Sequence, residues 1–166
     1  DPRRLGRVVL RGDPPNEKPL SELGFDPLLA MPSAAELRAR LARRRGPVKG
    51  LLLDQTFSAG VGNWVADEVL YQARLDPRTD VTTLTDDEVR RLRAKIQSVV
   101  RTAVAKDADS ARFPKSWLFH HRWKKGTKTA AGDAVAHTVV AGRTTAWVPA
   151  VQGRVRRRPA ASGRGG

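Results

Sequence analysis

The stretch from Leu51 to Pro77, LLLDQTFSAGVGNWVADEVLYQARLDP, decides the fold. Segments typical of helices lie on either side of its glycine-rich turn: one over 49–56, which begins two residues before this stretch, and one over 63–73. Gly60 and Gly62 allow the backbone to turn tightly and to approach a ligand closely. We therefore predict two helices joined by a turn, with open backbone at the start of the second helix.

The start of that second helix has the features of an anion site. Free N–H groups at a helix N-terminus attract negative charge, and Asn63 adds a side-chain amide at the first turn. Lys49, on the preceding helix, adds a positive charge. In the alternative interpretation Gly60 and Gly62 only join two packed helices, Asn63 is a neutral cap and Lys49 is a solvated charge. The glycine pattern alone does not decide between the two.

The sequence on both sides of this stretch predicts a small helical bundle. Ser33 with Glu36, and Thr85 with Glu88, form capping boxes that start helices. We expect one helix over 34–45 and a long one after the second box. The apolar inner stripe of the long helix is expected to be Val89, Leu92, Ile96, Val99, Val100 and Val104.

Beyond residue 109 the pattern changes to short strands separated by glycine-containing turns. The segments WLFHHRWKKG (117–126) and DAVAHTVVAGRTTAWVP (133–149) predict one or two β-hairpins. Gly142 supports a tight turn, and Arg143 at its tip can make a bidentate contact with a phosphate. The alternative for Arg143 is a solvated charge on an ordinary hairpin.

The stretch from 51 to 77 resembles the helix-two-turns-helix motif of formamidopyrimidine-DNA glycosylases and endonuclease VIII. The resemblance includes an LLDQ-like helix, the G-V-G-N turn and the A-D-E-V-L-Y helix, and it extends over most of the chain to GRTTAWVPAVQ. It implies that Asn63 and Lys49 hold phosphates around a DNA lesion, with Gly60 and Gly62 forming the turn. It implies a structural, bracing role for Glu68.

The hairpin segment resembles the finger of the same family in its form without zinc. Most members carry a four-cysteine zinc finger, whereas this chain has no cysteine. VVAGRTTAWVP is similar to the zincless finger of plant-type members, which implies that Arg143 is the finger arginine. Three lysines near the finger, with Trp123 among them, are candidate DNA contacts or simply a basic turn. These lysines are Lys124, Lys125 and Lys128.

The expected fold is mainly α: a helix-two-turns-helix bundle followed by a small β-hairpin unit. The LGRVVL segment (Leu5 to Leu10) has the composition of a strand. The resemblance implies that it is the last strand of a catalytic β-sandwich. The predicted divisions are that strand within 1–12, a proline-rich linker at 13–32, the DNA-binding bundle at 33–110, the zincless finger at 111–152 and a disordered basic tail at 153–166.

Charge and composition point to a polyanionic partner. The formal net charge is +14, and lysine and arginine gain affinity by displacing counterions from phosphates. An acidic membrane surface or a plain compositional bias are the alternatives. No cofactor is expected, and no metal, because cysteine is absent and the three histidines lack further ligands at a useful spacing.

Catalysis in this family uses an N-terminal proline amine with a glutamate beside it. This chain starts with Asp1, and Pro2 carries an amide nitrogen without nucleophilic character. We therefore expect no catalytic residue in this chain, which taken alone should be inactive.

The resemblance implies that this chain is the C-terminal part of a DNA glycosylase and abasic-site lyase for oxidised bases, and that its partner is double-stranded DNA with damaged bases or abasic sites. The sequence shows no apolar run long enough to cross a bilayer and no secretory signal at its start, so we expect a protein inside the cell without a membrane partner. We also expect a monomer and a nuclear location.

A second class of function is a structural RNA-binding protein. Some ribosomal proteins are strongly basic and contain a helix-two-turns-helix. The hairpin after residue 133 has no role in that interpretation, so the sequence favours DNA repair.

Overall fold

The computed structural model describes residues 23–153. The strand expected within 1–12, the first part of the expected linker up to residue 22, and the tail from 154 lie outside the described residues. None of the helices formed by residues 23–153 has the length and apolar character that a membrane-spanning helix requires.

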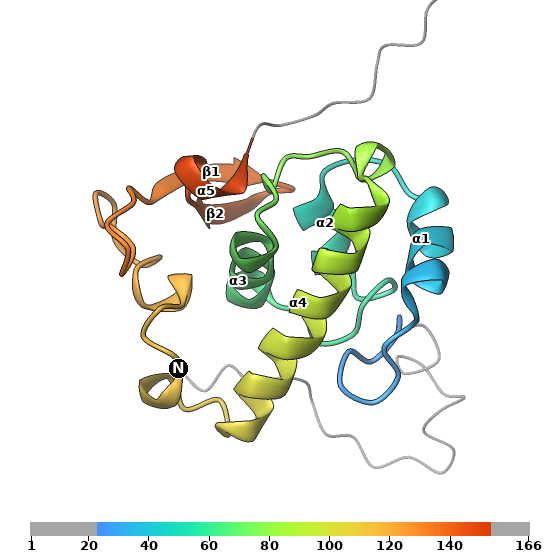
Figure 1. Cartoon of the computed structure of the whole chain (residues 1–166), viewed down its shortest axis with the longest axis horizontal. Helices are drawn as coiled ribbons and strands as arrows, with labels where there is room; N and C mark the ends of the chain where they lie inside the picture. Colours follow the sequence, from blue (N-terminus) through green and yellow to red (C-terminus); the bar gives the residue numbers. More distant parts are fainter. Residues whose placement is uncertain (1–22, 154–166) are drawn as a thin grey trace, which may run out of the picture.

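Four helices form the bundle in the first part of the molecule (Figure 1). They are α1 (Ala34–Ala42), α2 (Val48–Leu53), α3 (Asn63–Ala73) and α4 (Asp86–Ala105). Both predicted capping boxes are present, with reciprocal bonds between Ser33 and Glu36 and between Thr85 and Glu88. Helix α1 ends at Ala42, earlier than expected. Helix α2 also ends earlier than expected, because Asp54 turns the chain by accepting bonds from the N–H and hydroxyl of Thr56.

Helix α3 is the centre of the molecule, packed against α2, α4 and the β-hairpin (Figure 1). Helix α4 covers it with an apolar stripe at Val89, Leu92, Ile96, Val99 and Ala103. The prediction that Val104 belongs to this stripe was wrong, since its side chain is 43% exposed. At 3.6 residues per turn, Ala103 follows Val99 on the buried face and Val104 turns away from it.

The remaining unit is a single antiparallel hairpin of β1 (Ala136–Val140) and β2 (Arg143–Trp147), followed by the short helix α5 (Pro149–Gln152). The chain between α4 and β1 makes two 3-10 turns, η3 (Ser110–Arg112) and η4 (Leu118–His120). The strand expected within 117–126 is therefore a wrong prediction. Its backbone N–H groups at Leu118 and Phe119 bond to the Glu68 carboxylate of α3 instead of to a neighbouring strand.

The hairpin has its own small core and a direct connection to the bundle. Leu118, Val135, Ala146 and Val148 form this core. Gln152 on α5 accepts a bond from the Val148 N–H and donates one to the Leu75 carbonyl beyond α3. The observed architecture confirms the expected fold class, a mainly helical bundle followed by a small hairpin.

Candidate nucleic-acid interface

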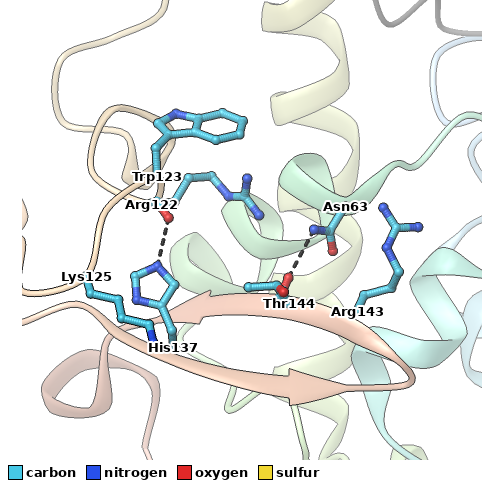
Figure 2. A pocket seen from close by; sticks show the side chains of 7 residues that line it. All are labelled: Asn63, Arg122, Trp123, Lys125, His137, Arg143 and Thr144. Carbon is cyan, nitrogen blue, oxygen red and sulfur yellow. Dashed lines mark hydrogen bonds between the residues drawn. The ribbon is translucent and has the colours of Figure 1, made fainter.

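A cleft of about 380 Å³ opens between the N-terminus of α3, the hairpin tip and the segment after η4 (Figure 2). Figure 2 shows Arg122, Trp123, Lys125 and His137 on one side, and Asn63, Thr144 and Arg143 on the other. These seven residues line the cleft. Three of them are cationic and none carries a carboxylate. Arg122 is paired with the buried Asp67, whereas Lys125 and Arg143 have no ion pair within residues 23–153, so the cleft suits an anion.

The turn before α3 leaves its backbone open. Gly60 has φ of +81°, a left-handed conformation that favours glycine, whereas Gly62 is extended at −92°. The Gln55 side chain holds this turn, accepting from the Gly60 N–H at 2.8 Å and donating to the Val61 carbonyl at 3.0 Å. A Cβ atom at Gly62 would meet no atom of residues 23–153 within 4 Å. Neither the backbone nor the described protein packing thus requires glycine at 62, and the space is free for a ligand.

Asn63 begins α3 beside this open turn. No side chain within residues 23–153 caps the helix, so its first N–H groups remain available to a ligand. The Asn63 Nδ2 atom donates to the Thr144 carbonyl on β2 at 3.0 Å (Figure 2). One hydrogen of that amide is used by this bond, and the second is left for another acceptor.

Arg143 reaches the same cleft from the hairpin. Ala141 and Gly142 form the two-residue turn with φ of 50° and 74°, as the tight turn between right-twisted strands requires. Arg143 follows as the first residue of β2, and it is exposed. No ion pair involving its guanidinium occurs within residues 23–153, so its donors are available to a ligand.

Lys49 lies in a different environment from the expected one. Its side chain is fully buried, and Nζ lies 2.7 Å from the Asp67 carboxylate. It also donates to the Thr145 hydroxyl at 2.6 Å and to the Thr144 carbonyl at 3.2 Å. Burial lowers the pKa of this amine, against the opposing effect of Asp67. Because its donors are used inside the protein, Lys49 joins α2 to the hairpin here and does not face the cleft.

Asp67 is the centre of this connection. One carboxylate oxygen pairs with Lys49, and the other accepts from Arg122 at 2.8 Å and from the Ala146 N–H at 3.0 Å. Asp67 is buried on α3, and Arg122 is buried after η4. Sequence reasoning missed both residues. The signal was present in the A-D-E part of the motif, where a second acidic residue stands on the inner face of an otherwise apolar helix.

Glu68 has the contacts of a brace. It is buried on α3 and accepts bonds from the N–H groups of Leu118 and Phe119, at 3.3 and 2.8 Å, and from Gln72 at 2.9 Å. These bonds hold the segment after α4 against the helix. Burial raises the pKa of this carboxyl to about 7, although its hydrogen bonds favour the charged form.

The three candidate lysines do not lie together in the cleft. All are exposed, and Lys125 lines the cleft while Lys124 and Lys128 do not. His137 on β1 lines it too, and its Nε2 bonds to the Arg122 carbonyl at 2.8 Å (Figure 2). Within the described residues no group of three or more histidine, cysteine or acidic side chains is placed to hold a metal ion.

The chain is similar to known proteins over most of its length. Residues 23–115 match the Formamidopyrimidine-DNA glycosylase H2TH domain. A formamidopyrimidine-DNA glycosylase of Arabidopsis thaliana is 42% identical over 92% of this chain and 39% of its own length. One of Moorella thermoacetica is 42% identical over 68% of this chain and 42% of its own length. The chain thus spans about two fifths of these two relatives.

Solved structures show the same fold. A complex between Lactococcus lactis Fpg and a DNA containing an abasic site matches with a TM-score of 0.68 and 26% identity, over 80% of this chain and 52% of that one. A second Lactococcus lactis structure, non-covalently bound to DNA with an abasic site, has a TM-score of 0.70 and 27% identity, over 80% of this chain and 50% of that one.

Proposed function

Because the chain belongs to the formamidopyrimidine-DNA glycosylase family, we propose that it binds damaged DNA in base-excision repair. It would act as the C-terminal part of a DNA glycosylase and abasic-site lyase that removes oxidised bases. We assign binding, and no catalytic role, to the described residues. The similar structures were determined with DNA that contains an abasic site, which supports this class of partner. The comparisons give no support to the RNA-binding alternative.

One observation carries the proposal: separate elements place phosphate donors around one cleft. Asn63 and the uncapped N-terminus of α3 come from the bundle, and Arg143 comes from the hairpin. We propose that these groups bind the DNA backbone beside the lesion, with Gly60 and Gly62 leaving room for its approach. Lys49 and Glu68 are positioning residues in this proposal, because their contacts fix the elements that carry the donors.

We propose further that the hairpin unit is a zincless finger. The chain has no cysteine, so the four-cysteine site of the family does not fit these residues. Two side chains of the bundle connect it to the hairpin: Lys49 donates to the Thr144 carbonyl and the Thr145 hydroxyl, and Asp67 accepts from the Ala146 N–H. Lys125 would add a contact inside the cleft, and Lys124 and Lys128 outside it. A monomeric state and a nuclear location remain part of the proposal.

The test compares three ligands at two salt concentrations: a duplex with an abasic-site analogue, the same duplex undamaged, and a structured RNA. We expect the abasic duplex to bind tightest, and the affinity for both duplexes to fall as salt rises because phosphate contacts release counterions. Fluorescence anisotropy with labelled ligands measures all three. A preference for RNA would reject the repair function, and equal binding of both duplexes would reduce the proposal to general DNA binding.

Arg143→Ala should weaken binding to the abasic duplex about 10- to 150-fold, since a hydrogen bond to a charged group contributes about 1.5–3 kcal/mol. The slope of log affinity against log salt concentration should become less steep by about 1, the value expected for the loss of one phosphate contact. Arg101→Ala removes the same charge from an exposed position on α4 and serves as the matched control. Similar losses in both variants would mean that net charge alone determines binding.

A further inference from the structure

Trp123 is exposed in an unusual place. Five large hydrophobic side chains are exposed among the described residues, and Trp123, at 54%, is the aromatic one. The others are Leu23, Leu29, Val104 and Val139, and none of them lines the cleft. Trp123 does line it, across the cleft from two groups that we assign to phosphate binding, Asn63 and Arg143 (Figure 2). An indole in a cationic cleft offers a flat apolar surface to the ligand that enters.

The indole is held in place from inside the protein. The Arg122 guanidinium lies 4.6 Å from the centre of its ring, and the Phe119 ring contacts it edge-on at 5.3 Å (Figure 2 shows the Arg122 contact). Arg122 is itself fixed by its ion pair with Asp67. The exposed part of the indole is therefore available without rearrangement, which lowers the entropic cost of stacking a ligand on it.

The cleft is larger than a phosphate contact requires. Its volume of about 380 Å³ lies within the range of about 300–1,000 Å³ that is usual for small-ligand sites. Its lining combines cationic side chains, which can bind the phosphates of a nucleic-acid backbone, with one exposed aromatic side chain. This combination is the one by which proteins bind single-stranded nucleic acid, where bases stack on aromatic side chains and phosphates meet positive charge.

We propose that Trp123 is a stacking platform for an unpaired DNA base. The backbone of the same strand would be bound by Asn63 and Arg143, so this inference rests on the proposed function. A paired base inside a duplex has both faces covered by its neighbours and cannot stack there. The site therefore selects strands with an unstacked base close to the bound phosphate.

The test uses two short single strands of equal length and charge: an ordinary oligodeoxynucleotide, and one whose residues are all abasic analogues. Trp123→Leu should weaken binding of the ordinary strand about 5- to 150-fold, the range that alanine substitution gives for stacking on one base. It should leave binding of the abasic strand within about threefold, because no base is present to stack. Trp123→Phe keeps an aromatic ring and should retain most of the affinity for the ordinary strand.

Two controls separate this inference from the proposed function. Val139→Ala removes an apolar side chain that is 69% exposed on β1 outside the cleft, and it should change neither affinity. Arg143→Ala should weaken both strands. If it does so while Trp123→Leu changes neither strand or both equally, base stacking is wrong and phosphate binding stands. If Arg143→Ala changes neither strand, the phosphate site itself is wrong.

Discussion

Replacing Asp67 by alanine should lower the free energy of unfolding by about 3–5 kcal/mol, the cost of removing one partner from a buried ion pair. The substitution leaves the buried Lys49 amine and the Arg122 guanidinium without their carboxylate, and the Ala146 N–H without its acceptor. Urea denaturation followed by circular dichroism measures this loss. Binding of the abasic duplex should fall as well, because the hairpin that carries Arg143 loses its Ala146 bond to α3 and keeps, within residues 23–153, only the hydrogen bond from Asn63 to the Thr144 carbonyl.

Asp87→Ala is the matched control for this experiment. Asp87 pairs with Arg91 on α4, and its side chain is 64% exposed. Exposed ion pairs contribute about 0.2–1 kcal/mol, so this variant should unfold almost like the parent. An equally small effect at Asp67 would show that Lys49 and Arg122 find other partners, and that the contacts of Asp67 do not stabilise the packing of the hairpin on the bundle.

Because the pKa of Glu68 is raised, the free energy of unfolding should fall as the pH rises from about 4.5 to about 7. Its pKa is raised from 4.5 to about 7 in the folded protein, so the folded state binds more protons than the unfolded state in this window. Stability falls with pH wherever the folded state holds more protons. The stabilisation from Glu68 is fully present below its unfolded-state pKa of 4.5 and is lost as the pH rises to its folded-state pKa of about 7. The total loss in the free energy of unfolding is about 3 kcal/mol.

The measurement is the free energy of unfolding at several pH values between 4 and 8, for the parent and for Glu68→Gln. Glutamine has no proton to lose, so the variant should show a flatter profile, and the difference between the two profiles isolates Glu68. Glu36→Gln, at an exposed glutamate of α1, controls for the loss of a carboxylate in general. Parallel profiles for the parent and Glu68→Gln would contradict the raised pKa.

Local signals in the sequence predicted the local structure well. Each capping box lies within four residues, and both helix starts were therefore confirmed. The helix over Asn63–Ala73 has the expected bounds, since glycines precede it and Arg74 ends it in a left-handed conformation. The two-residue turn at Ala141 and Gly142 placed Arg143 at the hairpin tip. In each case the deciding contacts lie within the segment itself.

Contacts between distant segments were beyond prediction. The position of Lys49 on a short helix does not reveal whether its amine faces solvent, because the deciding partners are Asp67 and Thr145 on two other elements. The segment 117–126 has the composition of a strand, but Glu68 takes the backbone N–H groups that a strand partner would need. Neighbours of this kind are fixed by tertiary packing and leave no periodic trace in the sequence.

The Thr144 carbonyl accepts both the Lys49 amine and the Asn63 amide, so α2 and α3 meet the hairpin at a single main-chain oxygen. Every amino acid supplies that oxygen. This junction therefore does not depend on which side chain stands at position 144, and a comparison of residue identities would not reveal that two helices share it. For this reason, tolerance of substitutions at position 144 would not measure the structural importance of its main-chain carbonyl.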